Sequence, residues 1–79
     1  MAEWFMPILA IYERPQDCPE SFVVREWIVT HKGRLFPNRR LATCVDLEAA
    51  RATVKRAIPN AVRLPRSPSD DPVVVESWI

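Results

Sequence analysis

The stretch DLEAARATVKRAI, residues 46–58, decides the fold because it is the one segment with a complete helical pattern. At about 100° per residue, its apolar side chains fall on one side and most of its charged side chains on the other. The carboxylate of Asp46 is placed to cap the first turn, and Pro59 cannot continue the helix. The pattern predicts a helix over residues 46–57 that packs on a partner through Leu47, Ala50, Val54 and Ile58.

Three segments outside the helix have the composition of β-strands. Residues 4–12 are apolar at almost every position, which predicts a strand buried on both faces in the centre of the sheet. Pro7 lacks a backbone donor, so regular pairing should begin near Ile8. Residues 21–31 and 73–79 are rich in β-branched and aromatic side chains and predict two further strands.

The order of these segments predicts an α+β fold: a small antiparallel sheet with one helix packed on one face, in β-β-α-β order along the chain. The last strand should pair antiparallel beside the first, which places the most apolar strand between the other two. The alternative is a right-handed crossover that sets the last strand parallel beside the second. Two shorter segments are candidates for minor strands: residues 34–36, which follow the turn at Gly33 and end at Pro37, and residues 61–64.

The length of 79 residues predicts a single domain over residues 1–79. A chain this short buries only about 60% of its unfolded surface, so oligomerisation is the most direct extra source of stability. The first residues contain no basic leader, and their apolar run is far shorter than the roughly 20 residues that span a bilayer. We therefore expect a cytoplasmic protein with no membrane association and with reduced thiols at Cys18 and Cys44.

No residue pattern in the sequence indicates catalysis. The one histidine, His31, has no cysteine or carboxylate at a spacing that indicates a catalytic or metal-binding set. A glycine-rich phosphate loop is excluded because Gly33 is the one glycine. Asp70 and Asp71 are adjacent in a proline-rich loop, and two adjacent carboxylates on an extended chain point in alternate directions, which makes them a weak pair for metal binding or acid–base catalysis. We predict no enzyme activity, no cofactor, no metal and no small-molecule ligand.

Charge is unevenly distributed along the chain, although the net charge is only +1. The middle of the sequence is basic and both ends are acidic. Cations that flank an aromatic residue suit phosphate contact together with base stacking, so nucleic-acid binding is one candidate function. Its candidate residues lie in a basic loop, residues 32–40, and on the outer face of the helix: Lys32, Arg34, Phe36, Arg39, Arg40, Arg51 and Lys55.

The other candidate surface is the face of the sheet that a single helix leaves uncovered. Alternation along the second and last strands places two tryptophans and two opposite charges there: Arg25, Trp27, Glu76 and Trp78. A face that mixes aromatic side chains with a few charges is typical of protein interfaces. We predict a protein-interaction module that self-associates as a homodimer or binds another protein partner. The alternative is a register shifted by one residue, which would make the tryptophans part of the core.

Overall fold

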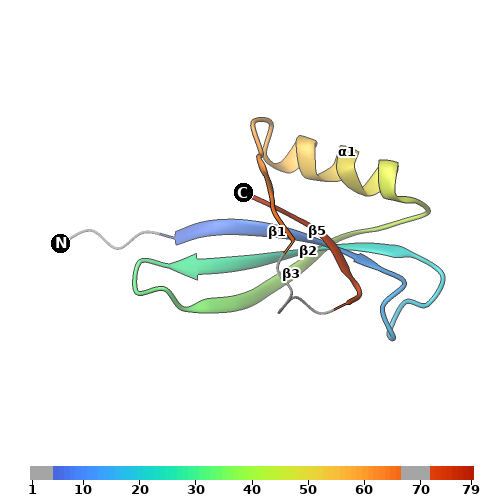
Figure 1. The fold of residues 1–79 in the computed structure, drawn as a ribbon, viewed down its shortest axis with the longest axis horizontal. Helices are drawn as coiled ribbons and strands as arrows, with labels where there is room; N and C mark the ends of the chain where they lie inside the picture. Colours follow the sequence, from blue (N-terminus) through green and yellow to red (C-terminus); the bar gives the residue numbers. More distant parts are fainter. Residues whose placement is uncertain (1–4, 67–71) are drawn as a thin grey trace.

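The computed structural model describes residues 5–66 and 72–79. The chain forms β1 (Phe5–Glu13), β2 (Phe22–Thr30), β3 (Leu35–Cys44), α1 (Leu47–Ala57), β4 (Arg63–Leu64) and β5 (Val74–Trp78). Neighbouring strands pair antiparallel in one sheet of spatial order β3-β2-β1-β5-β4, and α1 lies along one face of it (Figure 1). The predicted α+β fold with one helix on one face is confirmed. The predicted β-β-α-β order is incomplete, because β3 and β4 add a strand before and after the helix.

The helix α1 forms where the apolar periodicity predicted it. The Asp46 carboxylate accepts a hydrogen bond from the Ala49 backbone N–H at 2.8 Å, which caps the first turn. At the other end, the backbone leaves helical geometry at Ile58, directly before Pro59. The helix packs on the sheet through the four predicted residues: Ala50 and Val54 are fully buried, and Leu47 and Ile58 pack against the same cluster.

β1 is the central strand, as its continuous apolar composition predicted. Its pairing with β2 starts at Phe5 rather than at Ile8 and includes Pro7. The Glu13 N–H donates toward β5, and alternation along the strand points the Pro7 nitrogen to the same side. Because β5 pairs with β1 only from Leu9 onward, the missing N–H of Pro7 breaks no hydrogen bond between strands.

The stretch predicted as a basic loop, residues 32–40, belongs mostly to the ten-residue edge strand β3. The turn at Gly33 is as predicted, and its φ of +77° lies in the region that glycine adopts most easily. Pro37 does not end the strand, because an edge strand has one side without a partner. The pairing of β3 with β2 is irregular: its register shifts twice, once on each side of the pairs made by Arg25 and Glu26.

The last strand, β5, pairs antiparallel beside β1, as predicted. β4 has two residues and lies within the minor strand predicted for residues 61–64. The Val62 and Ile79 backbones exchange hydrogen bonds of 2.7 and 3.0 Å, which extend the β4–β5 pairing. Ile79 is therefore held in the sheet.

A bulge in β5 determines which of its side chains face the helix. β5 pairs Glu76 with Ile11 and Trp78 with Leu9, and these two β1 residues belong to the core cluster under α1. Val75 is the extra residue at the register shift. The predicted outward placement of Glu76 and Trp78 is wrong, because one inserted residue reverses the alternation along the strand.

The sheet is longer than the helix that covers it. The molecule measures 44 Å along its longest axis, whereas an 11-residue helix is about 16 Å long. The β2–β3 turn and the start of β1 extend beyond α1 at one end, and the β1–β2 loop lies at the other end (Figure 1). Four large apolar side chains are exposed at the extending end: Phe5, Met6, Leu35 and Phe36.

The core assignment predicts that Val54→Asp unfolds the protein. The substitution places a charge where the wild-type side chain is fully buried, with no partner to compensate it. The cost of several kcal/mol is comparable to the whole free energy of unfolding of a small domain. Circular dichroism with urea titration measures this. The control is Ala52→Asp, at an exposed position of the same helix, and it should leave the folded signal intact. A Val54→Asp variant that folds as well as the control would contradict the assignment.

Candidate interaction surface

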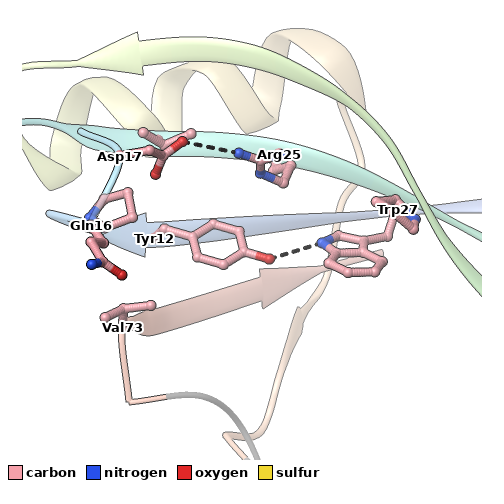
Figure 2. Close-up of a pocket in the computed structure, with 9 residues that line it drawn as sticks. Tyr12, Gln16, Asp17, Arg25, Trp27 and Val73 are labelled. Atoms are coloured by element: carbon pink, nitrogen blue, oxygen red, sulfur yellow. Dashed lines mark hydrogen bonds and ion pairs between the residues drawn. The ribbon is translucent and has the colours of Figure 1, made fainter.

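The second face of the sheet is covered by no helix or strand of residues 5–66 and 72–79, and we call it the open face. In β2, Val24 belongs to the core cluster under α1, so the residues beside it in the strand point the other way. The predicted outward placement of Arg25 and Trp27 is confirmed. Tyr12 joins them from β1, because it pairs with Val23 on the same face. Figure 2 shows the three side chains together, with α1 behind the strands.

The open face is hollowed where the β1–β2 loop, residues 14–21, bends over it (Figure 2). The hollow has a volume of about 510 Å³. Its walls combine aromatic, apolar and polar side chains, among them Tyr12, Pro15, Gln16, Asp17, Val23 and Trp27. Such a mixture suits a peptide or protein segment with an apolar centre and a charged margin.

Tyr12 and Trp27 are fixed against each other inside the hollow. The indole Nε1 of Trp27 donates a hydrogen bond to the Tyr12 hydroxyl at 3.0 Å. The Arg25 guanidinium lies over the Tyr12 ring, 5.9 Å from the ring centroid, within the range of a cation–π interaction. Side chains held in place before binding lose little conformational entropy on association, so this cluster is suited to act as an anchor.

Asp17 ties the β1–β2 loop to two strands. Its Oδ2 lies 3.5 Å from Nη2 of Arg25 in β2 and 2.9 Å from Nη2 of Arg40 in β3 (the Arg25 pair is drawn in Figure 2). Half-exposed ion pairs of this kind contribute little stability individually. Together they fix the loop as one wall of the hollow. They also give both arginines, Arg25 and Arg40, an acidic partner within the molecule.

The structure does not gather the predicted nucleic-acid residues on one surface. Three of the arginines pair with acids: Arg39 with Glu26 at 3.3 Å, Arg40 with Asp17, and Arg51 with Glu76. Phe36 pairs with Ile28, on the helix side of the sheet, whereas Arg40 pairs with Arg25 on the open face. Three of the predicted cations make no ion pair with a described residue: Lys32 and Arg34 at the β2–β3 turn, and Lys55 on α1.

Glu76 and Trp78, predicted on the open face, form a charged cluster on the helix side instead. Glu76 is 7% exposed, and Nε of Arg51 donates to both of its carboxylate oxygens at 3.0 Å. Nη1 of Arg63 and the indole Nε1 of Trp78 each donate to the same carboxylate at 3.2 Å. These contacts connect α1, β4 and β5 through one side chain. The hydrogen bond from Arg51 is the main reason that the pKa of Glu76 is lowered, although burial opposes the shift.

The sequence pattern does not predict this cluster, because it favours the outer helix face for Arg51 and the opposite side of the sheet for Glu76. The signal available was a lone acid in an otherwise apolar strand, since a buried acid requires a cationic partner. Arg51 lies three residues from Val54 and one from Ala50, at the margin of the apolar stripe.

The described part of the chain contains neither a metal-binding cluster nor a helix that could cross a membrane. Residues 5–66 and 72–79 contain no group of three histidine, cysteine or acidic side chains that could hold a metal ion. Cys18 and Cys44 are free thiols. Within the same residues, no helix has the length and apolar character needed to cross a membrane. Trp4, Asp70 and Asp71 lie outside the described residues.

The Glu76 cluster predicts that stability falls in acid. Because the folded-state pKa lies below the ordinary value of 4.5, Glu76 contributes stability above that value and loses it as pH falls through the folded-state pKa. Glu76→Gln removes the charge-assisted hydrogen bonds and should lower the free energy of unfolding at pH 7 by about 1–3 kcal/mol. Urea titration at pH 7 and pH 3 measures both effects. The difference between wild type and Glu76→Gln should shrink at pH 3, with Glu48→Gln, an exposed acid on α1, as the control. An equal difference at both pH values would contradict this prediction.

Comparison with protein-family models, with curated proteins and with solved structures gives no match to this chain.

Proposed function

We propose that this protein is a non-catalytic interaction module that self-associates through the open face of its sheet. The observation that carries the proposal is the cluster of Tyr12, Arg25 and Trp27, which is fixed in place on a face without a covering layer of described residues. Aromatic and arginine side chains are the residue types that most often dominate the free energy of protein association.

The size of the core supports a second copy as the partner. Among the described residues, only five large side chains are fully buried: Leu9, Ile11, Val23, Val24 and Val54. A domain with so small a core gains stability when another molecule covers its exposed apolar surface. The molecule measures 44 by 26 Å along its two longest axes, so a face of that order can supply the roughly 800 Å² per partner of a standard interface.

Trp27 is the predicted anchor of this association. Trp27→Ala removes an aromatic side chain from the centre of the open face and should weaken association by about 2 kcal/mol, roughly 30-fold in Kd. Light scattering at several protein concentrations measures the mass of parent and variant. Phe36→Ala is the matched control, because this aromatic residue lies in the neighbouring strand on the opposite face, and its association should equal that of the parent. A parent that stays monomeric at high concentration would contradict the proposal, as would a Trp27→Ala variant that associates like the parent.

Nucleic-acid binding is the second candidate function, and the β2–β3 turn is the place that favours it. Two phenylalanines and two cations line a second hollow there, of about 390 Å³: Phe5, Phe36, Lys32 and Arg34. Exposed aromatic rings beside cations without an acidic partner are the combination that binds single strands by stacking and phosphate contact.

Binding of single-stranded oligonucleotides at this turn should be strongest at low salt and fall steeply as salt rises, because phosphate contacts release counterions. Fluorescence titration with labelled oligonucleotides of mixed sequence measures the affinity. Lys32→Glu with Arg34→Glu should abolish binding, whereas Lys55→Glu with Arg56→Glu changes the charge equally on α1 and should preserve most of it. Failure to bind at low salt would end this second candidate.

A further inference from the structure

The hollow at the β2–β3 turn lies on the helix side of the sheet, where the strands continue past the end of α1 (Figure 1). Phe5 of β1 pairs with Thr30 of β2, and Phe36 of β3 pairs with Ile28 of β2. Ile28 and Thr30 are four and six positions from Val24, which belongs to the core cluster under α1. Side chains an even number of positions apart share one face of a strand, so both phenylalanines lie on the helix side.

The two phenylalanines flank β2 at a spacing that suits one flat ring. Neighbouring strands are about 4.8 Å apart, so β1 and β3 are separated by roughly 10 Å. A ring packed between two side chains takes up two contact distances, roughly 7–8 Å, whereas two stacked rings would need roughly 11–12 Å. Phe5 is 64% and Phe36 46% exposed, so both rings are accessible. The hollow of about 390 Å³ is also near the lower end of the roughly 300–1,000 Å³ typical of ligand sites.

Two cations, Lys32 and Arg34, line the same hollow from the turn. The Arg34 N–H donates to the Thr30 hydroxyl at 3.2 Å, and the Thr30 N–H donates to the Arg34 carbonyl at 2.9 Å, so the turn is held at the floor of the hollow. Neither cation makes an ion pair with a described residue. Residues 28–37 contain no acid, so the positive charge of the turn is available to an anion.

We infer that this hollow binds one unpaired nucleotide of a single-stranded nucleic acid, with its base stacked on the phenylalanines and an adjoining phosphate at Lys32 and Arg34. The inference rests on nucleic-acid binding, the second candidate function. It adds the size of the site and the separate contributions of base and phosphate. A base inside a duplex is stacked between its neighbours, so only an unpaired base can enter the hollow.

The combination of flat rings and cations selects this ligand class. Every base has a face that stacks on an aromatic ring, so the site accepts any of them, and the phosphate supplies the charge that the turn lacks. A peptide of acidic residues offers the same charge but no ring beside it. The hollow lies on the face opposite Trp27, so a bound nucleotide leaves the open face accessible for self-association.

Three DNA strands of eight nucleotides separate base contacts from phosphate contacts, because all three carry the same charge. One strand is fully abasic, one has a single central thymine in an abasic backbone, and one is all thymine. The single thymine should tighten binding to the parent about tenfold over the abasic strand. The all-thymine strand should gain at most about eightfold more, because it only offers more positions for the same one-base contact. Competition against one labelled all-thymine strand at low salt measures each affinity.

Two double variants remove the two contacts separately. Phe5→Leu with Phe36→Leu keeps apolar side chains but removes the rings, so the abasic and single-thymine strands should bind alike. Lys32→Gln with Arg34→Gln should weaken all three strands equally and flatten the salt dependence, by about 0.7 in slope for each lost phosphate contact. The control is Leu35→Ala, next to Phe36 but on the opposite face, and it should bind like the parent. Circular dichroism checks that every variant is folded.

The outcomes distinguish this inference from the candidate function on which it rests. If the abasic and single-thymine strands bind the parent equally, binding through phosphates stands and the inference is wrong. If the all-thymine strand gains far more than eightfold, several bases stack and the one-nucleotide site is wrong. Equal competition by an octaglutamate peptide, or no binding of any strand at low salt, overturns both. Trp27→Ala should bind the strands like the parent, so the result is independent of whether the protein self-associates.

Discussion

One helix of 11 residues can cover only part of one face of a five-stranded sheet, and this constraint shapes the rest of the molecule. Under α1, small and β-branched side chains allow close approach, and the fully buried residues Ala50 and Val54 sit against the centre of β1. Beyond the helix, the sheet continues with exposed Phe5 and Leu35. The uncovered surface is therefore a direct result of the ratio of helix to sheet.

The contact between the helix and the far edge of the sheet depends on Glu76. Its carboxylate receives hydrogen bonds from Arg51 of α1, Arg63 of β4 and Trp78 of β5. The bulge at Val75 makes this possible, because without it the alternation would point Glu76 toward the open face. A buried carboxylate in this position fixes the register of β5, since a slip by one residue would leave the charge without its partners. The same bulge turns the partly buried Trp78 toward the core cluster, whereas Trp27 of β2 lies on the open face.

The sequence predicts those parts of this fold that depend on local periodicity. The helix and its cap follow from Asp46 and the apolar stripe, and the central place of β1 follows from its continuous apolar run. The ten-residue β3 is not predictable in this way, because Pro37 ends a strand only where both sides of the strand are paired. The side-chain directions in β5 depend on a single inserted residue that no composition reveals. For the same reason alternation predicts the directions of Arg25 and Trp27 but not that of Glu76, because β2 is regular against β1 whereas β5 is bulged.

The edges of the sheet favour association through a face rather than through strand pairing. The outer edge of β3 carries Pro37, two register shifts and the charged side chains of Arg39 and Arg40, all of which hinder the addition of another strand. The opposite edge, β4, has only two residues and offers too short a template. Both edges thus have the features that protect sheets from edge-to-edge aggregation. The open face lacks these protective features. Its charged residues Arg25 and Arg40 are already paired with Asp17, and aromatic side chains that are fixed in place occupy its centre. A partner that covers this face can bury apolar area without breaking an internal ion pair, which keeps the desolvation cost of association low.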